Sequence, residues 1–312
     1  MQNRGECIVI LGTGGTIAGT ASSVGDHTGY RSGQLDVASL LACVPTLAGQ
    51  RLEAEQVAQL DSKDMDFVTW QRLAGRCAAH LARPEVGGVV VTHGTDTLEE
   101  TAWFLQRVLA PVKPLVLTAA MRPATALSAD GPQNLMDAVT VARGEGARGV
   151  VTVLSGRVWG AADVRKVHGY RVEAFDGGDA GPLALVEEGS LRVLRPWPEG
   201  EALGLGRVAL DPAQWPWVEI VVSAAGARGA AVDALVAAGV QGLVVAGTGN
   251  ATIHDDLAAA LRRAVQRGVA VRRASRGLAG RVVGGGEWPD AGALGPFKTR
   301  VELLLELLAR AE

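Results

Sequence analysis

Hydroxyl and carboxylate side chains follow two short apolar runs in the N-terminal half of the chain. The first run leads into GTGGTIAG, which carries Thr16 among glycines, and the second leads into HGTDTLEET, which carries Thr95 and Asp96. A threonine hydroxyl is a weak nucleophile at neutral pH, and it needs an activating neighbour and N–H groups that stabilise an oxyanion. Two threonines with a carboxylate therefore predict hydroxyl nucleophile chemistry on a small polar substrate.

Both turns are expected at the carboxyl ends of parallel strands. The apolar runs Cys7–Leu11 and Gly88–Thr92 are short and rich in β-branched residues, which is typical of buried strands in a parallel sheet. Open α/β sheets bind ligands at this edge, and the glycines of the first turn, Gly15 among them, let the backbone approach a ligand closely. A nucleotide-binding loop fits poorly, because Ile17 stands where the third glycine of a G-x-G-x-x-G motif would be.

A plainer interpretation of the same residues is helix capping. Thr16 could cap its own turn, and Thr95 and Asp96 could cap the helix that follows them. Glu99 and Glu100 are better placed for the first turn of that helix, which leaves Asp96 free for another role. The residues alone leave both interpretations open.

Alternating strand and helix patterns surround the two turns. Two further strands are predicted, at Pro114–Thr118 and Gly149–Leu154. Helical periodicity favours intervening helices at Val37–Leu47, Asp66–Leu81, Glu99–Leu109 and Gln133–Arg143. This alternation is typical of βαβ units and predicts a mostly parallel sheet flanked by helices. The irregular stretch Tyr170–Val193 is compatible with a β-hairpin.

The length of 312 residues indicates two α/β domains, of which the N-terminal one is larger. The stretch RPWPEGEALGLG, residues 195–206, is rich in proline, glycine and charge and has the composition of a linker. We place the N-terminal catalytic domain at residues 1–194, the linker at 195–216 and the smaller C-terminal domain at 217–312. The strands and helices predicted in the smaller domain are Val218–Val222, Gly242–Val245, Val269–Arg273, Ala231–Ala238, Asp255–Arg267 and Pro296–Ala311.

The composition is ordinary for a globular enzyme. The net charge is −3 and there is no basic block, which argues against nucleic acid as a partner. No apolar run reaches the roughly 18 residues that span a bilayer, so no membrane association is expected. The first strand begins almost at Met1 and leaves no room for a signal peptide, which favours a cytoplasmic protein. The three cysteines, Cys7, Cys43 and Cys77, include no close pair and are expected to be core thiols.

The histidines do not indicate a metal site. His93 is expected to be a structural residue at the end of a strand, and His27, His80, His168 and His254 show no metal-ligand spacing. Acyl transfer by a hydroxyl requires no cofactor. We therefore expect neither a metal ion nor an organic cofactor.

The motifs GTGGTIAG, HGTDTLEETA and AMRPATALSADGPQNL, with the C-terminal half, resemble the bacterial-type L-asparaginase and glutaminase-asparaginase family. The resemblance runs from about Cys7 to the C-terminus. It implies an amidohydrolase that converts L-asparagine to L-aspartate and ammonia through an acyl-threonine, and a homotetramer built from tight dimers. Comparable glutamine activity is an alternative, since one methylene in a pocket is worth only about 1–3 kcal/mol. A non-catalytic amino-acid binding protein is a further alternative, although binding alone would need no activated hydroxyl.

The resemblance also implies roles for individual residues. Thr16 is the nucleophile, and Tyr30, in the polar loop VGDHTGYRSGQ, lies on a lid that closes over the site and assists it. Thr95, Asp96 and Lys166 form a second triad, in which a desolvated lysine can lose its proton and accept another. A solvated surface lysine is the plainer interpretation of Lys166, but lysine is scarce in this arginine-rich chain.

Substrate contacts follow from the same resemblance. Ser62 stands where the family contacts the substrate α-carboxylate, and Asp96 would meet the substrate ammonium group. Lys63 replaces the glutamine that many relatives carry. Glu287 would reach the ammonium group from a neighbouring subunit, and Asn250 is a polar residue of another strand-to-helix turn. A solvated loop glutamate is the alternative for Glu287.

Overall fold

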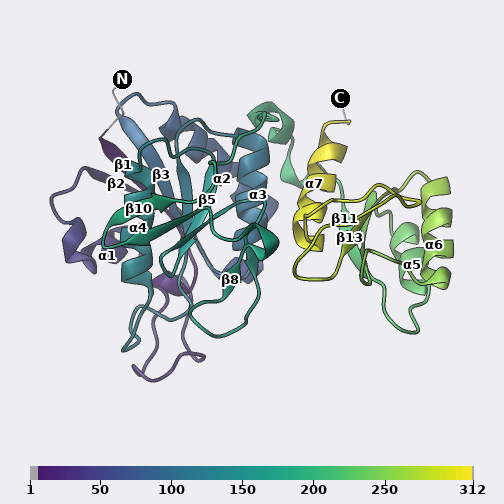
Figure 1. The fold of residues 1–312 in the computed structure, drawn as a ribbon, viewed down its shortest axis with the longest axis horizontal. Helices are drawn as coiled ribbons and strands as arrows, with labels where there is room; N and C mark the ends of the chain where they lie inside the picture. The colour runs from purple at the N-terminus through teal and green to yellow at the C-terminus, as the bar shows by residue number, and fades with distance from the viewer. Residues whose placement is uncertain (1–5, 311–312) are drawn as a thin grey trace. The chain divides into compact units, whose positions relative to one another are not determined.

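The computed structural model describes residues 6–310. The chain divides into two compact units, the first ending at Leu205 and the second beginning at Gly206. This division falls within the stretch 195–216 whose composition indicates a linker. Figure 1 shows the ribbon of both units. Within the described part of the chain, no helix is long and apolar enough to cross a membrane.

The first unit is built on one eight-stranded sheet. Its strands are β1 (Cys7–Gly14), β2 (Leu52–Leu60), β3 (Val86–Thr92), β4 (Leu115–Thr118), β5 (Val150–Leu154), β6 (Arg157–Gly160), β9 (Ala184–Glu187) and β10 (Ser190–Val193). The spatial order is β10-β9-β6-β5-β4-β3-β1-β2. The strands from β5 to β2 are parallel, and β6, β9 and β10 extend the sheet through antiparallel pairs. The predicted mostly parallel sheet is confirmed.

Helices cover both faces of this sheet. They are α1 (Val37–Ala42), α2 (Phe67–Leu81), α3 (Leu98–Leu109) and α4 (Gly131–Arg143). α1 and α4 share one apolar cluster with alternate side chains of the strands, such as Ile10 and Val90. The intervening side chains, such as Val9 and Val89, are equally buried on the other face. There α2 and α3 pack on each other and on the sheet, so the core has two apolar layers.

The β1–α1–β2 and β4–α4–β5 crossover connections differ in handedness. Both helices lie on the same face of the sheet, yet β1 leads to β2 toward one edge and β4 leads to β5 toward the other. All four strands are parallel. Two such crossovers on one face must have opposite hands, so one of them is left-handed, which is rare.

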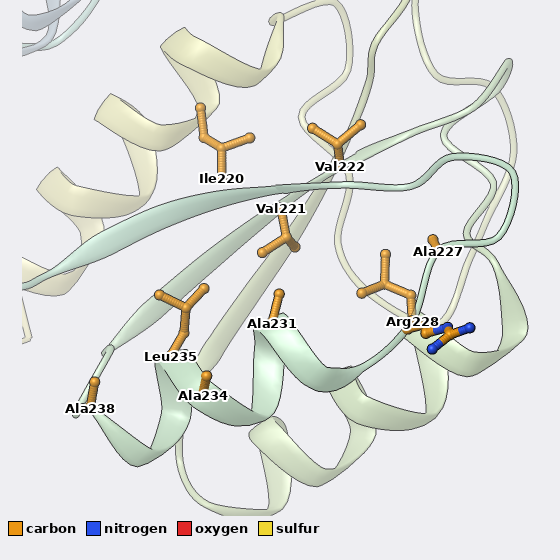
Figure 2. A pocket seen from close by; sticks show the side chains of 10 residues that line it. Ile220, Val221, Val222, Ala227, Arg228, Ala231, Ala234, Leu235 and Ala238 are labelled. Carbon is orange, nitrogen blue, oxygen red and sulfur yellow. The ribbon is translucent and has the colours of Figure 1, made fainter.

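The second unit is a smaller α/β domain, as predicted. It contains β11 (Val218–Val222), β12 (Gly242–Gly247), β13 (Ala270–Ser275), α5 (Ala230–Ala237), α6 (Asp255–Gln266) and α7 (Pro296–Leu308). The strands are parallel in the order β11-β12-β13. An apolar groove of about 670 Å³ runs between the edge strand β11 and α5. Figure 2 shows it, with Arg228 as its charged side chain.

β2 was not predicted from the sequence, because it is an edge strand with little apolar character. Its glutamates are paired with arginines from elsewhere in the unit. Glu53 contacts Arg83 at 2.7 Å, and Glu55 contacts Arg76 of α2 at 2.6 Å. The strand is held by these ion pairs and by its hydrogen bonds to β1. It therefore needs no long apolar run, which is the pattern that reveals buried parallel strands in a sequence.

The helix predicted at Val37–Leu47 is shorter than expected. It ends at Ala42, and Pro45 begins a separate 3-10 turn. A proline disfavours helical conformation in the residue before it, which explains the break. Cys43 at this end is exposed, so the expectation that it is a core thiol is wrong, whereas Cys7 and Cys77 are buried.

Candidate active site

Thr16 lies just beyond β1, in a 3-10 turn whose residues are all buried. Its hydroxyl oxygen lies 2.6 Å from the hydroxyl oxygen of Tyr30, and either group can donate the hydrogen bond. This distance is at the short end of the range for O–H···O bonds. The structure therefore brings Thr16 and Tyr30 together, in contact through the atoms that could exchange a proton.

Tyr30 is carried by an exposed segment that is closed at its base. The backbones of Thr20 and Arg31 exchange two hydrogen bonds, of 3.0 and 2.9 Å. Between them, Val24 is 60% exposed, whereas Tyr30 is half-buried. Gly19 lets the tyrosine ring approach, because a β-carbon there would lie 2.8 Å from Tyr30 Cδ2. A segment anchored at its base and exposed at its tip has the form that a lid requires.

The second turn, beyond β3, brings three predicted residues together. The Lys166 ammonium group donates to the Thr95 hydroxyl at 2.9 Å and to the Asp96 carboxylate at 2.5 Å. Lys166 belongs to the short strand β7 (Arg165–Lys166), and its backbone N–H donates to Glu99 at 3.3 Å. Its side chain is 19% exposed. The interpretation of Lys166 as a solvated surface lysine is therefore wrong.

Thr95 and Asp96 do not cap the helix that follows them. α3 begins at Leu98, with Thr97 in the N-cap position and no capping hydrogen bond from its side chain. The Thr97 hydroxyl donates instead to the backbone carbonyl of Ser62 at 2.8 Å. Because the capping interpretation of Thr95 and Asp96 is wrong, their side chains are available for the contacts with lysine.

Close backbone contacts bring the two threonine turns and the Ser62 turn together. A β-carbon on Gly15 would lie 2.4 Å from Gly94 Cα, and one on Gly94 would lie 2.4 Å from Ser62 Oγ. Gly15 also has a φ of 81°, which favours glycine. The Ser62 hydroxyl is buried and accepts the backbone N–H of Asp96 at 3.1 Å. The sequence thus uses two glycines to place these three segments in direct contact.

Lys63 brings a positive charge to the same region. Its ammonium group lies 2.5 Å from the Asp64 carboxylate and 3.9 Å from that of Asp61. The hydrogen bond to Asp64, together with attraction to Asp61 and Asp96, raises the pKa of Lys63 above its usual value. The residue that departs from the family pattern therefore lies close enough to Asp96 to interact with its charge.

The segment between β4 and α4 supports the first threonine turn. The Asp130 carboxylate accepts the backbone N–H groups of Met121 and Arg122, both at 3.0 Å. At the start of α4, a β-carbon on Gly131 would lie 2.9 Å from Ile17. The first turn of α4 therefore packs directly against the residue that follows Thr16, with no space for a side chain at Gly131.

His93 is fully buried at the end of β3, where a structural role was predicted. Burial lowers its pKa from 6.5 to about 4, so the imidazole is neutral near pH 7. Its two ring nitrogens contact the Gly94 carbonyl at 2.7 Å and the Thr101 hydroxyl at 3.0 Å. The Thr101 hydroxyl also accepts the indole N–H of Trp70 at 2.9 Å. The sequence analysis missed Trp70 and Thr101, because only the packing of α2 and α3 brings them to His93.

The predicted site residues of the second unit have partners within that unit. The side-chain amide of Asn250 exchanges two hydrogen bonds with the backbone of Val283, of 2.6 and 2.7 Å. Glu287 accepts two bonds from the Arg262 guanidinium, of 2.7 and 2.8 Å, which lower its pKa. Across residues 6–310, no three histidine, cysteine, aspartate or glutamate side chains are placed to hold one metal ion.

Comparisons with known protein families and solved structures agree along nearly the whole chain. Residues 7–199 match the family model described as Asparaginase, N-terminal, and residues 217–309 match the Glutaminase/Asparaginase C-terminal domain. A crystal structure of the Probable Cytoplasmic L-asparaginase from Campylobacter jejuni has a TM-score of 0.90 and 37% identity, over 96% of this chain and 94% of that one.

Curated relatives share about one third of their residues with this chain. The L-asparaginase 2 of Escherichia coli and the Probable L-asparaginase periplasmic of Haemophilus influenzae are each 36% identical, over 96% of this chain and 88% of the relative. The Glutaminase-asparaginase of Pseudomonas fluorescens is 35% identical, over 96% of this chain and 86% of the relative.

Proposed function

This chain belongs to the asparaginase family, and we propose that it hydrolyses L-asparagine to L-aspartate and ammonia with Thr16 as the nucleophile. The observation that carries the proposal is the pair of threonine contacts at neighbouring strand ends. The Thr16 hydroxyl contacts Tyr30 at 2.6 Å, and the Thr95 hydroxyl contacts Lys166 at 2.9 Å. Each hydroxyl thus has a group beside it that can exchange its proton.

In the first half-reaction, the Thr16 oxygen attacks the side-chain carbonyl of the substrate. The hydroxyl proton leaves through the contact with Tyr30 and is returned to the amide nitrogen, which departs as ammonia. The product of this step is an ester between the Thr16 oxygen and the substrate acyl group. Closure of the Tyr30 segment over the site would keep water away from the reaction until ammonia has formed.

In the second half-reaction, water attacks the ester, and L-aspartate leaves. In its neutral form, the Lys166 amine accepts a proton through the Thr95 hydroxyl as the water attacks. The Asp96 carboxylate stabilises the ammonium group that results. The proton then returns to the Thr16 oxygen, which restores the enzyme and completes the balance of the reaction.

The backbone at the second turn offers a donor for the developing oxyanion. The Thr95 N–H has no hydrogen-bond partner among residues 6–310. An N–H group that is fixed before the reaction and unpaired in the free enzyme is the kind of donor that stabilises a tetrahedral intermediate. This supports a place for the substrate carbonyl between Thr16 and the Thr95 backbone.

The two ends of the amino acid would contact different residues. The Ser62 hydroxyl holds the α-carboxylate, Asp96 holds the ammonium group, and Gly15, which has no side chain, leaves room for the substrate beside them. We assign Asn250 and Glu287 to the site of a neighbouring subunit, in a homotetramer built from tight dimers. Both side chains are exposed in the second unit, which is compatible with this role. In the assembly, Glu287 would exchange its contact with Arg262 for the substrate ammonium group.

L-Glutamine is the second candidate substrate. Relatives named Glutaminase-asparaginase and L-asparaginase 2 are equally similar to this chain, at 35 and 36% identity. Selection between the two amides depends on the space for one methylene group and amounts to about 1–3 kcal/mol. Measurement of kcat/KM for both amides decides which one is preferred.

A cytoplasmic location is part of the proposal. It is supported by the similarity to a protein whose name places it in the cytoplasm and by three free cysteines, as expected in a reducing compartment. Fractionation of cells that produce the protein tests this point, because a periplasmic protein would be released by osmotic shock.

Ammonia release tests the activity itself. The purified protein is incubated with L-asparagine, L-glutamine or no substrate, and ammonia and L-aspartate are measured together. Equal amounts of the two products from asparagine are expected. A protein that binds L-asparagine but releases no ammonia would instead be the non-catalytic binding protein that the sequence left as an alternative.

A further inference from the structure

A chain of buried hydrogen bonds ends at the second threonine turn. It begins at the Trp70 indole N–H, which lies 2.9 Å from the Thr101 hydroxyl. It continues from Thr101 to His93 Nε2 at 3.0 Å and ends with His93 Nδ1, 2.7 Å from the Gly94 carbonyl. Trp70, His93 and Thr101 are 4%, 0% and 0% exposed, so solvent does not compete for these bonds.

The direction of every bond in this chain follows from its two ends. A carbonyl oxygen only accepts, so His93 must carry its proton on Nδ1. An indole N–H only donates, so the Thr101 oxygen accepts from Trp70 and directs its own hydrogen to His93 Nε2. Burial lowers the pKa of His93 to about 4, so the ring remains in this single neutral form near pH 7.

The last bond fixes the peptide group between Gly94 and Thr95. A trans peptide is planar, and its C=O and N–H point in opposite directions. Because the Gly94 carbonyl points at the buried imidazole, the Thr95 N–H points away from it. That N–H has no partner within residues 6–310. The orientation of this peptide therefore decides whether the N–H faces the substrate.

Gly94 needs such a restraint because it cannot supply one itself. Glycine has no side chain to restrict its backbone and loses more conformational freedom on folding than any other residue. A larger residue is excluded, since a β-carbon would lie 2.4 Å from Ser62 Oγ. The indole at the other end is held by stacking on Phe104, with ring centroids 4.8 Å apart. The chain thus connects a stacked aromatic pair to a glycine whose backbone no side chain of its own restricts.

We propose that Trp70 and Thr101 are positioning residues that act through His93 to hold the Thr95 N–H toward the substrate carbonyl. This inference rests on the proposed function, in which that N–H stabilises the oxyanion. None of the three side chains touches the substrate. Their contribution is made in the transition state, and it appears in kcat more than in the affinity for a bound amino acid.

A matched pair of variants tests the role of Thr101. Thr101→Val keeps the shape of the side chain and removes the hydroxyl, whereas Thr101→Ser keeps the hydroxyl. We expect Thr101→Val to lower kcat for L-asparagine by about 10- to 100-fold, since small misplacements at a site have effects of this size. The Kd for L-aspartate is expected to remain within about twofold, and Thr101→Ser to remain near the wild type. Circular dichroism verifies that both variants fold.

Two results would overturn the inference while leaving the proposed function intact. One is a wild-type kcat in folded Thr101→Val. The other is an equal loss in Thr101→Val and Thr101→Ser, with kcat and affinity for L-aspartate reduced together, which would indicate a merely structural residue. Failure of the proposed function looks different, because the wild-type enzyme itself would then release no ammonia.

Histidine NMR on the wild-type protein tests the same inference without a variant. With ¹⁵N-labelled histidine, we expect His93 to be protonated at Nδ1 and unprotonated at Nε2 from pH 8 to pH 5. His93→Gln identifies the signal by its loss. A proton on Nε2, or a cationic ring at pH 7, would contradict the hydrogen-bond directions and overturn the proposal even if Thr101→Val does not fold.

Discussion

The two threonine turns have the same sequence character but are held by different kinds of neighbours. Within the described residues, the one side-chain partner of the Thr16 hydroxyl is Tyr30, on an exposed segment. The neighbours of the Thr95 turn are instead Lys166 of β7 and Ser62 of the turn after β2. Lys166 contacts both Thr95 and Asp96, and Ser62 holds the Asp96 backbone.

This difference indicates how the two turns would share the reaction. A tyrosine on a loop can move away to admit substrate and return to activate Thr16, so acylation would depend on closure of that loop. A lysine held between a hydroxyl and a carboxylate is already in position before the substrate arrives, which suits the attack of water on the ester. In the proposed reaction, the first turn would serve a step that needs exclusion of water, and the second would serve a step that uses it.

The largest effects are expected from removing either hydroxyl. Thr16→Ala and Thr95→Val should each reduce kcat for L-asparagine by about 10³-fold or more, because each removes a group that reacts or transfers a proton. Thr13→Val is a matched control in the first motif. Its hydroxyl donates to the Thr92 carbonyl at 2.9 Å, so the change should leave kcat within a few-fold. Near-normal rates in both threonine variants would eliminate the mechanism.

The role of Lys166 sharpens the contrast, because it requires an amine that can lose its proton. We expect Lys166→Arg to lose about 10²- to 10³-fold in kcat, almost as much as Lys166→Met, since arginine keeps the charge but cannot act as a base. Lys113→Arg provides the control, because among residues 6–310 the Lys113 ammonium group donates only to the Arg83 carbonyl, at 2.6 Å. Recovery of activity in Lys166→Arg would mean that the charge alone matters.

Tyr30→Phe should affect acylation but not hydrolysis of the acyl-enzyme, with a smaller loss of rate than the threonine and lysine variants. It should slow formation of the acyl-enzyme by about 100-fold, the low end of the usual contribution of a proton-transfer group, and leave its hydrolysis unchanged. Rapid-quench measurements of ammonia and L-aspartate follow the two steps separately. If hydrolysis of the acyl-enzyme slowed instead, the division of work between the turns would be wrong.

The buried His93 predicts a loss of stability in acid. Its pKa is 6.5 in the unfolded chain and about 4 in the folded protein, so between these values the unfolded state binds more protons. Stability from this residue is present above pH 6.5 and is lost as the pH falls toward 4, by roughly 3 kcal/mol. Urea unfolding of the wild type and of His93→Gln, at pH 7.5 and 4.5, measures it. An equal pH dependence in both proteins would contradict the assignment.

The smallest effect is expected from chelation. The threonine, tyrosine and lysine groups supply every proton transfer in the proposed reaction, so dialysis against EDTA should change kcat by less than about twofold. Loss of ammonia release on dialysis, with recovery on adding a divalent ion, would show that the account is missing a component.

The sequence predicted the turns better than it predicted their surroundings. Thr16 and Thr95 follow short apolar strands, a pattern that depends on neighbouring residues and is visible locally. Lys166 lies 71 residues beyond Thr95, and only the family resemblance connected them. β2 escaped detection because this edge strand pairs with β1 without an apolar run of its own.

Trp70 and Thr101 show a further limit of sequence patterns. Each is an ordinary buried residue on an amphipathic helix, and its local sequence predicts packing alone. Their connection to Gly94 exists only because α2 packs on both β3 and α3. Contacts of this kind, between polar atoms of distant elements, depend on the three-dimensional arrangement and leave no periodic pattern.

The central claim is that the first turn forms the ester and the second removes it. It is tested most directly by trapping the intermediate in Lys166→Met, in which hydrolysis should be slower than acylation. The variant is mixed with L-asparagine, quenched in acid and digested, and its peptides are examined by mass spectrometry. The account predicts an aspartyl ester on the peptide that contains Thr16, and its absence when Thr16→Ala is added to the same variant. An ester on the Thr95 peptide, or L-aspartate formed at a normal rate, would contradict it.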